Sequence, residues 1–220
     1  MSYDDPGLAD QKPSLRLDAR RNLDKLRNAA ASAFNRSGLG VPLEEIARQA
    51  GVSTGTLYNR FGGREALIDE VFSEVLEDRL TTAVDRAEQE SSPWQKFERY
   101  VWELGSLQAA NPALNDLISQ RYPGAQKLAA VCERGMSHAR RFISEAQVAG
   151  SLRSDFGVDD LFLILWTNAA LLRATTGEAS GVWCRRMSMS IDGLRAPVSR
   201  PLPAGDPLAM AAVNQLLQQK

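Results

Sequence analysis

Small and polar side chains that can bind nucleic acid are concentrated in one short stretch of the chain. Asn pairs well with adenine in the major groove, Thr contacts bases or the thymine methyl group, and Tyr and Arg reach phosphate oxygens. The residues of this set are Ser53, Thr54, Gly55, Thr56, Tyr58, Asn59, Arg60 and Arg64. We predict that together they form a DNA-binding surface.

Two short helices around a tight turn are expected to carry this surface. In the first helix, residues 43–50, apolar side chains recur at helical spacing on one face. Gly51 should end this helix, because a helix end often needs a left-handed residue and Gly adopts that conformation at little cost. Ser53 suits the N-cap of the second helix, since its hydroxyl can accept a free backbone N–H.

One face of the second helix is predicted to be buried, and the opposite face is predicted to be exposed. Leu57 and Phe61 are four residues apart, so they lie on the same side and face back toward the first helix. At about 100° per residue, Thr56 and Asn59 then lie on the opposite side. The polar side is therefore predicted to face the DNA, and the apolar side to face the protein.

Several short motifs in this region together resemble the DNA-binding domain of the TetR family of transcriptional regulators. These motifs are Ile46-Ala47, Gly51-Val52-Ser53, Thr56-Leu57-Tyr58, Phe61 and Arg64-Glu65-Ala66-Leu67. An Ala-x-x-x-Gly spacing alone also fits an ordinary corner between two helices, but the full set of motifs favours the family. The resemblance covers roughly residues 20–72 and implies a helix-turn-helix domain.

The resemblance also carries expectations for phosphate contacts. It implies that Arg64 reaches a phosphate from the start of a fourth helix. A Thr that commonly contacts phosphate in this family is absent here, where the sequence has Val41, Pro42 and Leu43. That contact is therefore not expected in this chain.

The distribution of charge agrees with a local DNA site. The whole chain has a formal net charge of −1, but residues 11–64 contain ten Lys or Arg and only four Asp or Glu. A basic segment on an otherwise acidic chain is the expected footprint of a DNA-binding region. Double-stranded DNA is accordingly the first predicted partner.

The remaining sequence reads as helical throughout, which predicts an all-α fold of about nine helices. With 220 residues and 44% hydrophobic content, the chain can bury a substantial core. The predicted organisation is a flexible N-terminal arm (1–19), a helix-turn-helix DNA-binding domain of three helices (20–65), a helical effector-binding and dimerisation domain (66–195) and a Pro-rich C-terminal tail (196–220). The first helix is expected over about 20–37. A weak terminal helix over Leu208–Gln218 is an open alternative to disorder.

Large apolar side chains inside the second domain suggest a pocket for a small-molecule effector. The predicted lining residues are Phe97, Tyr100, Cys132, Met136, Phe142, Phe162 and Trp166. Each of these residues also fits an ordinary core position. The effector itself is not identified by the sequence.

Val158–Thr176 is apolar nearly all round, so more than one side of this helix must be covered. In the resemblance, the last two long helices pair with their copies in a dimer. We therefore predict a homodimer held by Val158–Thr176 and Val182–Leu194, with Leu165 and Leu172 in the seam.

Catalysis, metal binding and cofactor binding are not expected. His138, the single histidine, is six residues from Cys132, so the two lie on different faces of one helix. Neither a metal-ligand spacing nor a Gly-rich phosphate loop outside the helix-turn-helix appears. Without a long apolar run or a signal peptide, the protein is expected to be cytoplasmic, with no membrane partner.

The sequence thus predicts a DNA-binding regulator, most simply a ligand-responsive repressor that binds a near-palindromic operator as a dimer. An activator or a corepressor-dependent regulator fits the same residues. A helical small-molecule-binding protein with a vestigial DNA reader is a further alternative, against which the intact Thr56, Tyr58, Asn59 and Arg64 argue.

Overall fold

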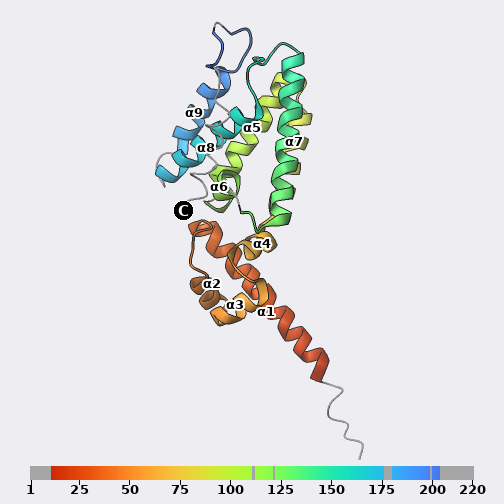
Figure 1. Cartoon of the computed structure of the whole chain (residues 1–220), viewed down its shortest axis with the longest axis vertical. Helices are drawn as coiled ribbons and strands as arrows, with labels where there is room; N and C mark the ends of the chain where they lie inside the picture. Colours follow the sequence, from red (N-terminus) through yellow and green to blue (C-terminus); the bar gives the residue numbers. More distant parts are fainter. Residues whose placement is uncertain (1–10, 111, 121, 176–179, 199, 204–220) are drawn as a thin grey trace, which may run out of the picture.

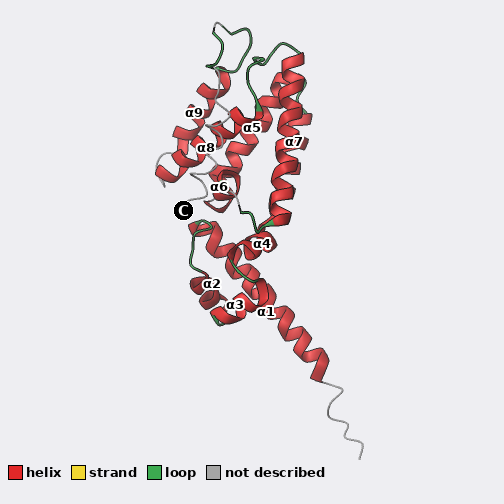
Figure 2. Ribbon diagram, viewed as in Figure 1, coloured by secondary structure: helices red, strands yellow, loops and turns green. Residues whose placement is uncertain are grey.

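The computed structural model describes residues 11–110, 112–120, 122–175, 180–198 and 200–203. Within these residues every regular element is an α-helix, and one isolated antiparallel bridge joins Leu152 to Arg195 (Figure 2). The helices are α1 (Gln11–Ser37), α2 (Leu43–Ala50), α3 (Thr54–Phe61), α4 (Arg64–Glu88), α5 (Pro93–Ala110), α6 (Pro112–Ser119), α7 (Gln126–Val148), α8 (Val158–Ala174) and α9 (Ser180–Asp192). The predicted all-α architecture of about nine helices is confirmed.

The molecule is elongated, with the helix-turn-helix at one end. Figure 1 shows α2 and α3 beside α1 at the bottom of the view, and α5 to α9 at the top. We call the DNA-binding domain of α1 to α3 the reader, and α5 to α9 the upper part. The fourth helix, α4, packs against α1 and α3 of the reader and against α5 and α7 of the upper part. This helix therefore connects the two ends of the molecule.

The core of the reader forms because α1 repeats small and large apolar residues at helical spacing. Leu26, Ala30 and Phe34 are all buried on one side of this helix. The ring of Phe34 packs against that of Phe72 on α4, with 6.0 Å between centroids. This contact places α4 against the three-helix domain.

The first helix differs from the sequence-based prediction at its start. It begins at Gln11 rather than near residue 20, so the backbone of 11–19 is helical and is not part of an arm. Pro13 is compatible with this start, because N–H groups in the first turn have no partner within the helix. The rest of the predicted arm, residues 1–10, lies outside the described residues.

Part of the predicted Pro-rich C-terminal tail contacts the loop between α7 and α8. The Leu202 N–H donates to Asp155 Oδ2 at 2.7 Å, and Arg153 Nη2 donates to the Arg200 carbonyl at 3.0 Å. These bonds hold residues 200–202 against the loop between α7 and α8. The alternative terminal helix, Leu208–Gln218, lies outside the described residues.

Aromatic rings form the core of the upper part. The ring centroids of Trp94 and Phe97 on α5 lie 5.7 Å apart, and the Phe97 ring meets the Phe156 ring edge-on with 5.8 Å between centroids. Tyr100 packs on Phe142 at 5.1 Å. Edge-on and tilted contacts of this kind are the favoured geometries for aromatic pairs. In the described part of the chain, no helix has the length and apolar character needed to cross a membrane.

The turn between α2 and α3 allows a direct test of backbone conformation. Gly51 has φ of 71°, and an added Cβ would meet no other atom within 4 Å. Gly51→Ala should therefore lower the free energy of unfolding by about 1 kcal/mol through left-handed backbone strain alone. Gly55→Ala is the matched control, because Gly55 lies inside α3, where Ala is the better helix former. Equal effects in thermal or urea unfolding would contradict this assignment.

Candidate nucleic-acid interface

The turn between α2 and α3 is built as the sequence predicted. Gly51 ends α2 in the left-handed conformation, and the Val52 N–H donates to the Ala47 carbonyl at 3.0 Å. Ser53 is the N-cap of α3, since its Oγ accepts the Thr56 N–H at 3.1 Å. Local backbone chemistry thus fixes the angle at which α3 leaves α2.

The two faces of α3 differ sharply in exposure. Leu57 is fully buried between the helices, whereas Tyr58 is 47% exposed. Most of the predicted DNA-binding residues are exposed on the outside of this helix or at its start: Ser53, Gly55, Thr56, Tyr58, Asn59 and Arg60. Thr54 and Arg64 are half-buried. The structure therefore brings together a continuous polar surface on α3.

Two hydroxyl groups at the start of α3 are paired with each other. Ser53 Oγ and Thr56 Oγ1 lie 2.9 Å apart and share a hydrogen bond. This bond fixes the rotamers of both side chains. Asn59 and Arg60 have no such local partner described, so they present the more open polar groups of the face.

Arg64 has a structural role that the sequence did not reveal. Its Nη1 donates to the carbonyl oxygens of Leu39 and Val41, each at 2.6 Å. These carbonyls belong to the loop between α1 and α2, so Arg64 ties the start of α4 to that loop. A phosphate contact by Arg64 stays a proposal and would use its other guanidinium nitrogens.

The same loop is held from the opposite side by Asp116 on α6. The Leu39 N–H donates to Asp116 Oδ2 at 2.8 Å, and Arg173 on α8 lies 3.6 Å from the other carboxylate oxygen. Burial raises the pKa of the Asp116 carboxyl, while the Leu39 N–H and the Arg173 guanidinium oppose that shift. No sequence signal marked Asp116, because a single acid on a short helix has no pattern.

Acidic side chains near the start of α4 fasten it to the start of α7. Asp69 Oδ1 accepts the Leu128 N–H at 2.7 Å, and the Glu65 carboxylate accepts the Gly124 N–H. The N-cap of α7 is Ala125, which has no side chain able to cap the helix. The acids of α4 therefore cap α7 from outside and complement the positive end of its dipole.

The residues predicted to line the effector pocket differ in burial. Phe97, Tyr100 and Phe142 are buried core, and the Tyr100 hydroxyl donates to the Gly135 carbonyl at 2.8 Å. Cys132, Met136, Phe162 and Trp166 are only partly exposed. Sequence pattern cannot distinguish an aromatic core from an aromatic pocket, because both need large apolar side chains.

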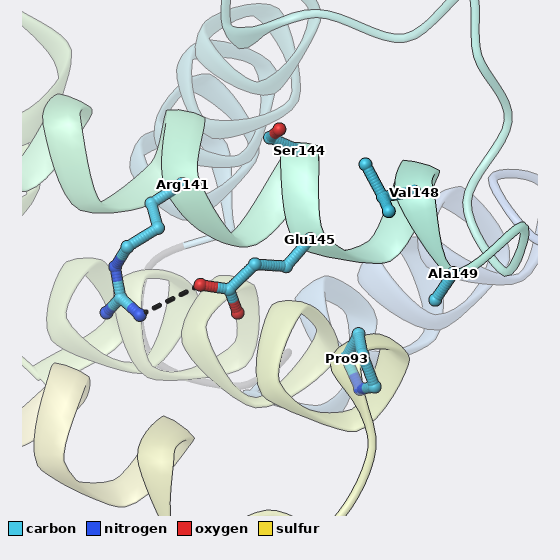
Figure 3. Close-up of a pocket in the computed structure, with 6 residues that line it drawn as sticks. All are labelled: Pro93, Arg141, Ser144, Glu145, Val148 and Ala149. Carbon is cyan, nitrogen blue, oxygen red and sulfur yellow. Dashed lines mark hydrogen bonds and ion pairs between the residues drawn. The ribbon is translucent and has the colours of Figure 1, made fainter.

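Two surface hollows of about 470 Å³ each lie elsewhere. One is lined by Pro93, Arg141, Ser144, Glu145, Val148 and Ala149, and Figure 3 shows the ion pair of Arg141 and Glu145 at its side. The other lies between α4 and α7, where Glu77 pairs with Arg134. Neither hollow includes a residue predicted to bind the effector.

No chemistry beyond binding is apparent in the described residues. They contain no group of three or more His, Cys, Asp or Glu side chains that could hold a metal ion. Burial raises the pKa of the Cys132 thiol to about 11, so this thiol stays protonated at neutral pH and is a poor nucleophile.

The helix-turn-helix region matches a known protein family. The sequence profile of bacterial regulatory proteins of the tetR family matches residues 26–71, which contain α2, α3 and the buried half of α1. Residues 26–71 therefore match the DNA-binding domain of the TetR family. This match confirms the resemblance to TetR-family transcriptional regulators, a non-enzymatic family, that was predicted from the sequence.

A curated relative covers a larger part of the chain. The HTH-type transcriptional regulatory protein RaaS of Mycobacterium tuberculosis is 24% identical over 130 residues. The match takes in 59% of this chain and spans only 58% of the length of RaaS. The similarity thus extends beyond the helix-turn-helix but does not reach across the whole relative.

Solved structures support the fold over most of the chain. FadR from Bacillus subtilis, in complex with stearoyl-CoA, gives a TM-score of 0.58 at 16% identity and covers 78% of this chain and 99% of FadR. RolR in complex with resorcinol gives a TM-score of 0.54 at 15% identity, and the match covers 93% of this chain and 96% of RolR. At these identities the likeness establishes the shared all-helical fold.

The hydrogen bonds of Asp116 and Arg64 with the loop between α1 and α2 give a second prediction. Asp116→Ala leaves the Leu39 N–H without an acceptor in a buried place, so the free energy of unfolding should fall by roughly 1–3 kcal/mol. Hydrogen exchange of peptides covering residues 38–42 should become faster. Asp116→Asn is the matched control, because its amide oxygen can still accept that N–H. Exchange that is unchanged in Asp116→Ala would show that the loop does not depend on this bond.

Proposed function

We propose that this TetR-family protein is a ligand-responsive repressor that binds a near-palindromic operator as a homodimer in the cytoplasm. The observation that carries the proposal is the exposed polar face of α3, which is held rigidly by the buried Leu57 and the cap at Ser53. A helix presented in this way fits the major groove of DNA, with a half-site for each subunit about 34–36 Å apart.

Roles on α3 follow from position. Asn59 lies on the side of the helix opposite Leu57, where base edges are nearest, so it is proposed to read an adenine. Tyr58 is at the flank of the same face and is proposed to contact phosphate. Phosphate contacts supply affinity without sequence information, whereas contacts to base edges supply specificity.

An apolar surface on α8 and α9 supports a symmetric dimer. Met189 is 61% exposed and Val182 is 45% exposed on α9, and Ile164 on α8 is also partly exposed. Arg186 of α9 donates to the Ile164 carbonyl at 3.1 Å, so the two helices form one surface. A two-fold axis would cover this surface with its own copy.

The position of the seam differs from the sequence-based expectation in one residue. Leu165 is only 3% exposed within a single chain, because it faces α5 and α6, so it belongs to the core of the protomer. Leu172 is partly exposed and stays in the proposed seam. A charge at Leu165 would disturb folding rather than test the dimer.

The fold relatives support an effector in the upper part of the molecule. FadR is described with stearoyl-CoA and RolR with resorcinol, and the chain here shares their fold. We infer that this protein also binds a small molecule among α5 to α9. Such a ligand shifts DNA binding only through its different affinity for the two conformers.

A gel-shift assay with DNA upstream of the protein's own gene tests the proposal as a whole. Specific retention, together with higher transcript levels in a deletion strain, is expected for a repressor. Lower transcript levels in the deletion strain would indicate an activator. Retention that competitor DNA of random sequence abolishes would indicate a reader without a specific operator.

A pair of substitutions on α3 separates base reading from phosphate binding. Asn59→Ala should change the preferred sequence at one operator position, at a cost of about 1–3 kcal/mol for that base pair. Tyr58→Phe should weaken binding to operator and random DNA alike. Selection from a random DNA pool measures the first effect, and titration of both DNAs measures the second. A consensus unchanged in Asn59→Ala would remove Asn59 from the reading set.

Arg64→Ala does not test phosphate binding alone in this chain. Removing Arg64 also frees the carbonyls of Leu39 and Val41, so a loss of DNA affinity would combine two causes. Any test with this variant therefore needs its unfolding curve beside its DNA titration.

The dimer seam is tested by placing a charge on its exposed part. Met189→Glu leaves the core intact, because Met189 is on the surface, but it puts two carboxylates near each other across a two-fold axis. We expect the mass measured by light scattering to fall from dimer to monomer, with loss of binding to a two-half-site operator. Val148→Glu, at an exposed residue on α7 away from the seam, is the control. A Met189→Glu protein that stays a tight dimer would place the seam elsewhere.

A further inference from the structure

Three buried amide side chains meet where α5, α6 and α8 pack together. Gln108 on α5 donates its Nε2 to the Leu165 carbonyl at 2.9 Å. Asn168 on α8 donates its Nδ2 to Gln108 Oε1 at 3.0 Å. Asn115 on α6 donates its Nδ2 to the Ala169 carbonyl at 3.1 Å. All three side chains are almost completely excluded from solvent.

This arrangement leaves two acceptors unpaired. Asn115 Oδ1 and Asn168 Oδ1 are buried and accept no hydrogen bond from the described residues. The amide orientations are fixed by the neighbouring acceptors, because Asn168 Nδ2 faces Gln108 Oε1, Gln108 Nε2 faces the Leu165 carbonyl and Asn115 Nδ2 faces the Ala169 carbonyl. Turning either Asn would place an oxygen against another oxygen. The two unpaired oxygens are therefore a property of the packing.

Unpaired buried acceptors lower the stability of the folded protein, and apolar side chains could occupy these positions instead. A buried polar group without a partner typically destabilises a protein, whereas an apolar residue of similar shape is neutral or stabilising. Leu161, Leu165 and Ala169 surround Asn168 on the same buried side of α8. A polar residue kept among such neighbours points to a role other than stability.

The chemistry of the cluster defines what it can bind. Two carbonyl-type oxygens accept hydrogen bonds, so the complementary groups are hydroxyl or amide N–H donors. The three amides carry no charge, and the charged side chains next to them, Asp116 and Arg173, pair with each other at 3.6 Å. An ionised ligand would therefore find no unpaired counter-charge beside the amides. The complementary molecule is uncharged, with an apolar body.

We propose that Asn115 and Asn168 form an effector subsite for an uncharged molecule that carries hydroxyl or amide donors on an apolar body. This inference rests on the proposed ligand-responsive function and deepens it. Binding requires α6 to shift relative to α8, since the amides are packed together when the site is empty.

The subsite is directly connected to the reader through α6. Asn115 is followed by Asp116, which holds the Leu39 N–H of the loop between α1 and α2. Ser119 at the end of α6 donates to the Asn115 carbonyl at 2.6 Å and accepts from Arg173 at 3.2 Å. A ligand that displaces this short helix therefore also displaces the acceptor of the loop.

The experiment uses the full chain and a matched pair of probes. Resorcinol carries two O–H donors on an apolar ring, and 1,3-dimethoxybenzene has the same ring and oxygens without donors. Thermal midpoints and calorimetric affinities are measured for wild type, Asn115→Leu and Asn168→Leu. Thr167→Val is the control on α8, because the Thr167 hydroxyl donates to carbonyls of its own helix, accepts from Arg186 and bonds none of the three amides.

Resorcinol at millimolar concentration is expected to raise the thermal midpoint of wild type and of Thr167→Val, while the dimethyl ether is not. Asn168→Leu should bind resorcinol about 10-fold or more weakly than wild type. Three results overturn the subsite: no shift of wild type by resorcinol, equal shifts by both probes, or affinity retained in both Leu variants.

Operator binding on the same samples separates the subsite from the proposed function. Resorcinol that binds through Asn115 and Asn168 and releases the operator supports both. If it binds in this way but leaves operator affinity unchanged, the subsite stands and ligand-responsive control through it fails. If operator binding is intact and resorcinol does not bind, the subsite fails and the DNA-binding function stands.

Discussion

The peptide group of Leu39 is the point on which the relation between the reader and the rest of the molecule depends. Its N–H is held by Asp116 of α6, and its carbonyl is held by Arg64 of α4. Gly38 makes this approach possible, because it has φ of 80° and a side-chain carbon there would lie 2.8 Å from Asp116 Oδ2. A buried peptide group needs both partners, so movement of either α4 or α6 away from the loop would break one of these hydrogen bonds.

The first turns of α4 fix a second relation, between α4 and α7. Asp69 and Glu65 satisfy N–H groups at the start of α7, which Ala125 cannot cap. Glu70 adds ion pairs to Arg27 of α1 and Lys127 of α7. The reader is thus attached to the upper part by several contacts through α4 and by the packing of α6 against α1, where the Asp116 carboxylate also accepts the Leu39 N–H.

In the proposed ligand response, the buried amides at α5, α6 and α8 set stability against responsiveness. Gln108 and Asn115 donate to helix carbonyls of α8, and the bond from Asn115 holds α6 in place, while two oxygens stay unpaired. An apolar interface would hold α6 more firmly and would have no reason to open. An interface of moderate stability allows two conformers of similar free energy, which any ligand-controlled regulator needs.

The sequence by itself determined what short-range chemistry controls. Gly51, Ser53 and Leu57 act within one or two helical turns, so the turn, the cap and the buried face of α3 were predictable from residue type and spacing. Helical periodicity likewise determined the all-α fold. Only the tertiary structure decided the roles of Arg64 and Asp116, and the start of α1 at Gln11. Leu39 and Asp116 are 77 residues apart, and periodicity tells which face of a helix is buried but not which partner covers it. For the same reason, Tyr100 and Phe142 were recognisable as buried aromatic residues, but only the packing of α5 against α7 made them core.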